Sequence, residues 1–318
     1  MNVVCIGELL IDFVCTDQQT PMKDSVHFLK KTGGAPANVA ACIAKLGGQS
    51  QFAGAVGKDP FGDSLIEALQ TRQVDTSLVV QLPTPTTLAF ISLAADGERE
   101  FVFNRGADGQ YQLSDKQVKN IMQGCSILHL GSATALLGDE LYQTYQQALR
   151  AAIECDVPVC FDPNYRIDLW PDREQEFVER SLQFIRHAKL VKVSDEELTL
   201  LTGKQDLADG CQYLHDLGAK IITVTLGPKG CYLSTQQQQA MIPAYKIKPI
   251  DTTGAGDSFI GALLYQLAKQ PDCDFDTIAD YVLFANKVSG IVCEHLGPMT
   301  GLSDYQSIAK TKKELNKN

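Results

Sequence analysis

Short apolar runs alternate with segments of helical periodicity along most of this chain. The runs that predict strands are residues 3–6, 51–56, 127–130, 157–161, 190–193 and 221–225. The segments that predict helices are residues 36–46, 60–73, 141–153 and 258–269. A strand–helix rhythm of this kind predicts an α/β fold, a three-layer αβα sandwich with a mostly parallel sheet and helices on both faces. Ligands of such sheets bind beyond the carboxyl ends of the strands.

Two stretches break this rhythm and read as hairpins. In residues 11–31, Phe13 and Val14 and then Val26 and Phe28 flank a polar turn. Residues 86–104 form two apolar runs around Asp96-Gly97, a strong hairpin turn signal. These strands need a sheet of their own, so we expect a small β-sheet lid from about 11–31 and 86–107, within one domain that spans residues 1–318.

Composition narrows the partners and the compartment. The 318 residues carry 28 basic and 38 acidic side chains, and 28 − 38 gives a formal charge of −10. An acidic balance argues against nucleic acid and anionic membranes as main partners. The ten cysteines show no metal-ligand spacing, which favours reduced core thiols. We find neither a signal peptide nor an apolar run long enough to span a membrane, so we expect a cytoplasmic protein.

The richest chemical signal is the run Asp251-Thr-Thr-Gly-Ala-Gly-Asp257, which enters the apolar helix at residues 258–269. Unpaired amides and a positive dipole end make a helix start favourable for anions. Gly254 and Gly256 allow the backbone to approach a ligand closely. A carboxylate beside an anion site, here Asp257, suits phosphoryl transfer, in which it takes a proton from the attacking hydroxyl.

Four further segments place polar residues where loops leave strands or enter helices. Gly33-Gly-Ala-Pro-Ala-Asn38 enters a helix. By itself this segment fits either a sugar-binding turn or an ordinary capped helix. The segment 162–166 follows a strand and ends in Arg166, which can hold a hydroxyl-rich or anionic substrate or lie in solvent.

The other two segments point to metal and nucleotide. Residues 192–197 open a helix, where Glu197 can orient magnesium-bound water or simply complement the helix dipole. The turn 225–230 can border a nucleotide, but it is weak by itself. The dinucleotide fingerprint and the GxxxxGK[ST] phosphate loop are both absent, which leaves an oxidoreductase as a distant alternative.

Taken in this order, the five segments resemble the ribokinase-like (PfkB) family of carbohydrate kinases. Residues 251–257 look like the family's C-terminal signature and residues 33–38 like its N-terminal one. The resemblance runs to about residue 302. Within the family, GELLIDF, GGAPANVA, FDPNYR and KVSDEE look most like bacterial fructokinases.

The resemblance implies ATP-dependent phosphorylation of the primary hydroxyl of D-fructose to fructose 6-phosphate, with Mg²⁺ and often K⁺. It also implies a lid that often pairs two subunits. 2-Keto-3-deoxygluconate kinase, aminoimidazole riboside kinase and ribokinase remain alternatives within the family. A catalytically silent sugar sensor on the same fold is the alternative from another class.

Roles carry over by position in the same way. Asp257 matches the general base, and the amides of Gly254, Ala255 and Gly256 match the anion hole. The positions that match sugar-binding residues are Asp12, Gly33, Gly34 and Asn38, with Arg105 and Arg166 at the far end of the substrate. The positions that match the nucleotide site are Lys192, Ser194, Thr225, Gly227, Gly230, Gly256 and Asn286. Glu197 matches the residue that holds Mg²⁺ through water, and Asp251 and Thr253 match part of a monovalent-cation loop.

Overall fold

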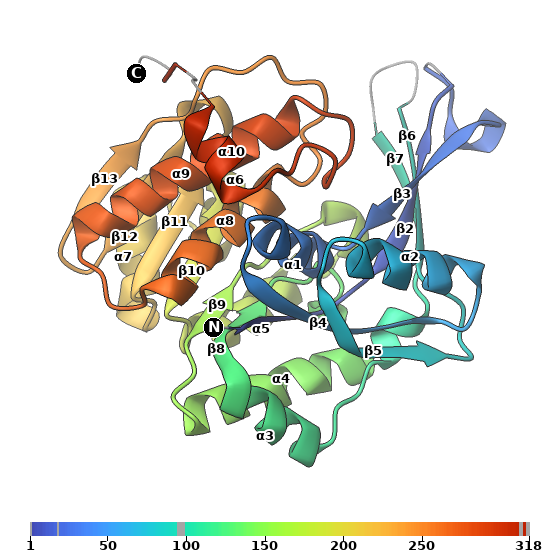
Figure 1. The fold of residues 1–318 in the computed structure, drawn as a ribbon, viewed down its shortest axis with the longest axis horizontal. Helices are drawn as coiled ribbons and strands as arrows, with labels where there is room; N and C mark the ends of the chain where they lie inside the picture. Colours follow the sequence, from blue (N-terminus) through green and yellow to red (C-terminus); the bar gives the residue numbers. More distant parts are fainter. Residues whose placement is uncertain (1, 18, 94–98, 312–313, 316–318) are drawn as a thin grey trace.

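A computed structural model describes residues 2–17, 19–93, 99–311 and 314–315. Within them, nine strands form one large sheet (Figure 1). In spatial order they are β13 (Gln239–Ile242), β12 (Cys231–Thr235), β11 (Ile221–Thr225), β10 (Leu190–Ser194), β9 (Val159–Phe161), β8 (Cys125–Leu130), β1 (Asn2–Ile6), β4 (Gln49–Gly57) and β5 (Asp75–Leu82). The strands from β11 to β5 are parallel, and β12 and β13 add two antiparallel strands at one edge.

Helices cover both faces of this sheet, which confirms the predicted three layers. The helices of one face are α1 (Ala35–Lys45), α2 (Pro60–Gln70), α8 (Ala255–Lys269), α9 (Phe275–Cys293) and α10 (Tyr305–Lys310). Those of the other face are α3 (Asp115–Gly124), α4 (Asp139–Glu154), α5 (Glu174–Ile185), α6 (Asp195–Thr202) and α7 (Leu207–Leu217).

Side-chain alternation along β1 shows why both faces need cover. Val3 and Cys5 belong to the apolar cluster under α1 and α8, whereas Val4 and Ile6 belong to the cluster under α4 and α5. All four side chains are fully buried. A strand that is apolar on both faces is stable only between two layers of helices.

The lid is a second sheet of four strands, in the order β3 (Phe28–Gly33), β2 (Leu10–Cys15), β6 (Leu88–Leu93) and β7 (Arg99–Asn104). Each predicted hairpin pairs antiparallel, and the two hairpins join through the parallel pair β2–β6. Figure 1 shows this sheet standing beside α2 at one end of the molecule. The predicted Asp96-Gly97 turn lies outside the described residues.

Most predicted boundaries lie within three residues of the observed ones. The strand predicted at residues 157–161 is shorter, since the Val157 amide donates to the carbonyl of Ala152 in α4 at 2.8 Å instead of entering the sheet. Among the described residues, no helix is long and apolar enough to cross a membrane.

Candidate active site

The run 251–257 forms a loop that ends in the first turn of α8, as predicted. Gly254 caps the helix with φ of +77°, and a Cβ there would lie 2.3 Å from the Cβ of Pro298, so only glycine fits. The amide of Ala255 donates to Thr252 O at 3.2 Å, so it is engaged within the loop. Helix geometry leaves the amides of Gly256 and Asp257 without an intrahelical acceptor, which makes them the anion-facing pair.

Asp257 and Asn38 lie in direct contact, which joins the two signature segments. Asn38 Nδ2 donates to Asp257 Oδ2 at 2.7 Å, and the Asn38 side chain is buried in α1. Burial raises the pKa of Asp257, opposed by the hydrogen bond from Asn38 and by the positive charges of Arg166 and Lys192. A carboxylate with a raised pKa, held in one orientation, suits a general base.

The other predicted sugar-facing residues lie where the lid meets the main sheet. A Cβ on Gly33 would approach Asp12 Oδ2 to 2.3 Å, which places these two residues in contact across the β2–β3 ladder. Gly34 has φ of +109°, and a Cβ there would lie 2.4 Å from the carbonyl oxygen of Glu8. We call residues 33–35 the sugar turn, after the role that we predicted for Gly33 and Gly34.

A buried ion pair lies beside the anion-facing amides. Lys192 Nζ on β10 is 3.0 Å from Asp162 Oδ2, with side chains 9% and 3% exposed. A Cβ on Gly256 would lie only 3.1 Å from Lys192 Nζ, so the ammonium adjoins the start of α8. Burial lowers the pKa of Lys192, but the carboxylates of Asp162, Glu197 and Asp257 outweigh it, and the amine stays protonated. An ammonium and two free amides at a helix start fit a phosphate group.

Glu197 closes a capping box at the start of α6. Its Oε2 accepts from the Ser194 amide and its Oε1 from the Tyr165 amide, both at 2.8 Å, while Ser194 Oγ accepts from the Glu197 amide. The carboxylate thus links two predicted segments, 162–166 and 192–197. In the described ranges, no cluster of three or more His, Cys, Asp or Glu side chains could hold a metal by itself.

The two predicted arginines differ in their surroundings. Arg105 is 3.0 Å from Asp139 through Nη1, and its Nη2 donates to Thr134 O at 3.1 Å. Arg166 is exposed, donates to the carbonyl of Tyr165, and its charge lowers the pKa of Asp257. Of these two arginines, Arg166 is therefore the one whose charge acts on Asp257.

Two of the predicted nucleotide residues converge on the end of β13. Asn286 Nδ2 donates to the carbonyls of Ile242 and Pro243 at 3.2 and 3.0 Å. Gly230 has φ of +103°, and a Cβ there would lie 2.1 Å from the Ile242 carbonyl oxygen. Gly227 has φ of +54° in the turn after β11, and Thr225 Oγ1 donates to Val193 O at 3.3 Å. These four residues therefore lie close to backbone groups beyond the end of β11. Their role in nucleotide binding stays a prediction.

Asp251 is held by contacts that the sequence did not reveal. Its Oδ2 accepts from Lys31 Nζ at 3.0 Å and from the Gly297 amide at 2.9 Å, while Oδ1 accepts from the Thr253 amide at 2.9 Å. Burial raises the pKa of Asp251, but these donors outweigh it and lower the pKa to about 2. The carboxylate that we predicted to bind a monovalent cation already faces an ammonium from the lid.

Three other buried polar residues near the strand ends did not stand out in the sequence. Glu8 is 1% exposed, and Asp108 and His129 are fully buried. Glu8 interrupts an otherwise apolar run, which is the one signal that could have pointed to it.

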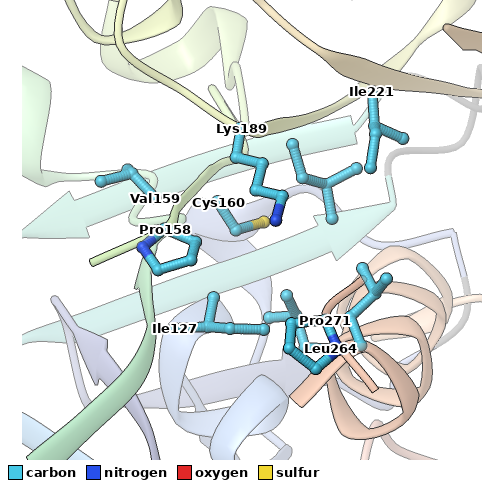
Figure 2. Close-up of a pocket in the computed structure, with 10 residues that line it drawn as sticks. Ile127, Pro158, Val159, Cys160, Lys189, Ile221, Leu264 and Pro271 are labelled. Atoms are coloured by element: carbon cyan, nitrogen blue, oxygen red, sulfur yellow. The ribbon is translucent and has the colours of Figure 1, made fainter. Parts of the chain in front are cut away.

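Figure 2 shows a small pocket away from these residues. Ile127, Val159, Leu190 and Ile221 line it at the amino ends of the parallel strands, together with Leu264 of α8. The candidate site lies at the opposite, carboxyl ends. With a volume of about 30 Å³, the pocket is also far smaller than the roughly 300–1,000 Å³ typical of ligand sites.

The known proteins that this chain resembles include carbohydrate kinases. The family model described as "pfkB family carbohydrate kinase" matches residues 1–304. A curated relative, "Probable fructokinase-5" of Arabidopsis thaliana, is 36% identical, with 98% of each chain covered. Fructokinase from Vibrio cholerae O395, solved with fructose, ADP and calcium ion, matches with a TM-score of 0.83, 33% identity and 97% of each chain covered. Fructokinase from Xylella fastidiosa, solved with bound ATP, has a TM-score of 0.84, 30% identity and the same coverage.

The match of the family model over nearly the whole chain agrees with the two signature segments that meet at Asn38 and Asp257. This protein belongs to the PfkB family of carbohydrate kinases.

Proposed function

We propose that this protein is an ATP-dependent fructokinase that phosphorylates the primary hydroxyl of D-fructose to give fructose 6-phosphate. The contact between Asn38 and Asp257 is the observation that carries the proposal. It places a half-buried carboxylate beside the helix start where a phosphoryl group would lie. The relatives named above support the sugar, because they are fructokinases and one was solved with fructose and ADP.

Asn38 is suited to bind the sugar as well as to orient the base. Its Nδ2 is used by Asp257, whereas its buried Oδ1 has no hydrogen-bond partner among the described residues. A buried acceptor without a donor is costly, and a sugar hydroxyl would supply that donor. Asp12 and the sugar turn would contact other hydroxyls, while Arg166 and Arg105 would reach the far end of the sugar.

In the proposed reaction, Asp257 accepts the proton of the sugar hydroxyl as the hydroxyl oxygen attacks the γ-phosphorus of ATP, and the bond from that phosphorus to the β,γ-bridging oxygen breaks to release ADP. The amides of Gly256 and Asp257 and the ammonium of Lys192 stabilise the negative charge of the transferred phosphoryl group. Mg²⁺, when bound, would neutralise charge on the phosphate oxygens, and Glu197 and Asp162 are the carboxylates placed to hold it through water. Gly227, Gly230 and Asn286 would shape the nucleotide edge, with Thr225 and Ser194 nearby.

A potassium site at Asp251 and Thr253 stays a prediction. Because Lys31 already neutralises Asp251, no step of the proposed reaction uses K⁺.

A sugar panel with ATP tests the proposal. Purified protein is assayed with D-fructose, ribose, 2-keto-3-deoxygluconate, aminoimidazole riboside and glucose, and the product is identified by NMR of the phosphate position. We expect fructose to have the highest kcat/KM and to yield fructose 6-phosphate. If another sugar has the highest kcat/KM, that sugar replaces fructose as the proposed substrate. If no sugar of the panel binds or causes ADP release, a different acceptor is favoured. Sugar binding without any ADP release would favour the silent sensor.

We further propose that the chain is one catalytic domain that works in the cytoplasm and pairs with a second copy through the lid. All ten cysteines are free thiols, as expected in a reducing compartment. Leu29 on β3 exposes 42% of its surface on the lid, which supports an interface there. Sedimentation equilibrium of the wild type and of Leu29→Asp would test the pairing, with a monomeric wild type as the contradicting result.

A further inference from the structure

A buried carboxylate outside the proposed catalytic pair holds the start of α1. Glu8 lies in the loop between β1 and β2 and is 1% exposed. Its Oε1 accepts from the amide of Ala35, the first residue of α1, at 3.0 Å and from the amide of Ala133 at 3.4 Å. Its Oε2 accepts from the hydroxyl of Ser132. Glu8 therefore joins the sugar turn to the loop that follows β8.

A second buried carboxylate, Asp108, joins the base of the lid to that same loop. Its Oδ2 accepts from Thr134 Oγ1 at 2.7 Å, and its Oδ1 accepts from the hydroxyl of Thr87. Thr87 Oγ1 in turn accepts from the amide of Gly106 at 2.8 Å. Thr87 precedes β6 and Gly106 follows β7, so this pair holds the two roots of the lid hairpin together.

Each of the two hydroxyls donates its single proton to a carboxylate, and the Thr134 amide donates to Ser132 Oγ at 3.1 Å, which joins the two halves of the network. A continuous polar chain thus runs from Glu8 through Ser132 and Thr134 to Asp108. We call it the Glu8–Asp108 chain. Two buried carboxylates in one network are costly, and Arg105, with Nε 3.7 Å from Asp108 Oδ2, is the one cation paired with them among the described residues.

We propose that the Glu8–Asp108 chain positions the acceptor sugar by coupling the lid root to the sugar turn, an inference that rests on the proposed sugar-kinase function. Ala35 begins the helix that carries Asn38, and Asn38 orients Asp257. At its other end the chain fixes the hairpin that pairs with β2, the strand of Asp12. Glu8 and Asp108 are thus positioning residues: a shift at either end changes how the sugar lies against Asp257.

Thr134→Val tests this coupling because valine has nearly the shape of threonine and keeps the amide that donates to Ser132, but it cannot donate to Asp108. We expect the KM for the sugar to rise about tenfold while the KM for ATP stays within about twofold, a loss of roughly one charge-assisted hydrogen bond. Thr144→Val is the matched control. Thr144 is also buried and donates to the carbonyl of Tyr111 at 2.9 Å, but it lies outside the chain. Equal changes in both KM values, or the same sugar effect in Thr144→Val, would overturn the proposal.

Hydrogen exchange provides a readout that does not depend on turnover. In Asp108→Asn we expect faster amide exchange at residues 34–38, across four hydrogen bonds from the substitution, with unchanged exchange at residues 286–292 of α9. Unchanged exchange at residues 34–38 would overturn the coupling. The kinetic comparison uses whichever sugar the wild type phosphorylates fastest, so a failure of the fructose assignment leaves this test intact.

Discussion

Asn38 Nδ2 lies 2.7 Å from Asp257 Oδ2, although 219 positions separate the two residues in the sequence. α1 and α8 pack side by side on the same face of the large sheet. Asn38 is the fourth residue of α1, and Asp257 is the third residue of α8. The amide donor fixes the carboxylate, and the helix start beside it supplies the anion-facing amides. This geometry brings the proposed base and the proposed phosphate site into contact.

Replacing Asp257 by Asn should remove the base and leave the shape of the site nearly unchanged. We expect kcat to fall at least about 100-fold with little change in the KM for the sugar, because general-base catalysis contributes roughly 10²- to 10⁴-fold. Asp276→Asn is the control, since Asp276 is an exposed acid in the first turn of the neighbouring α9. Turnover near the wild-type rate in Asp257→Asn would exclude Asp257 as the base.

Replacing Asn38 by Ala should change the pH dependence of catalysis. The hydrogen bond from Asn38 favours the charged form of Asp257 and lowers its pKa, so its loss raises that pKa further. The acid limb of the kcat profile should move to higher pH by about one unit, the equivalent of roughly 1.4 kcal/mol. A profile that keeps its acid limb while kcat falls would show that Asn38 does not act through Asp257.

The periodicity of the chain predicted most of the large sheet, because buried parallel strands are apolar on both faces. The strand at residues 221–225 was predicted with its observed bounds, and β10 to within one residue. β5 was not predicted. It is an edge strand whose polar and partly exposed positions give no continuous apolar run. A sequence pattern reports burial, and an edge strand is only partly buried.

The site was predictable where a segment has a local chemical signature. Gly254 and Asp257 stand out because a glycine-rich loop enters a helix, and the structure confirms that local geometry. The contact of Lys31 with Asp251 and the Glu8–Asp108 chain join segments far apart in sequence. No local pattern marks such partners, because strand order and lid packing decide which side chains meet.

Lys192 and Asp162 form a buried ion pair, so removing one charge should be costlier than removing both. Lys192→Met leaves the buried Asp162 carboxylate uncompensated and should lower the free energy of unfolding by about 3–5 kcal/mol. The double variant Lys192→Met/Asp162→Asn should recover much of that stability but not turnover, because the ammonium beside Gly256 is still missing. Urea unfolding and kcat measure the two effects. A double variant less stable than Lys192→Met, or one that regains turnover, would contradict this account.

Lys31 connects the lid to the loop before α8 through its 3.0 Å contact with Asp251, and both side chains are mostly buried. Lys31→Met should raise the KM for the sugar about fivefold, the equivalent of roughly 1 kcal/mol, and should reduce its dependence on ionic strength. The adjacent Lys30, which is exposed and contacts Ser64, supplies the control variant Lys30→Met. The KM is measured at low and high tetramethylammonium chloride. An equal effect of both substitutions would argue against a specific lid contact.

His129 should make the fold sensitive to acid. The ring is fully buried on β8 between Cys5 and Cys160 of the neighbouring strands, and neither ring nitrogen has a hydrogen-bond partner in the described part of the chain. Burial, reinforced by the charge of Lys192, lowers the pKa of His129 to about 3, well below its value near 6.5 in an unfolded chain. Between these values the unfolded state binds one more proton than the folded state. The stability is therefore present above pH 6.5 and is lost as the pH falls toward 3.

The expected size of this loss is about 1.4 kcal/mol per pH unit below pH 6. His129→Leu should abolish this contribution, so the stability difference between wild type and variant should shift in favour of the variant as the pH falls. Burial raises the pKa values of Glu8 and Asp162, which act in the opposite direction but are common to both proteins and cancel in the difference. Urea unfolding at pH 7.5, 6.0 and 5.0 measures it. A difference that stays constant over this range would show that the pKa of His129 is the same in the folded and unfolded states, which would contradict this account.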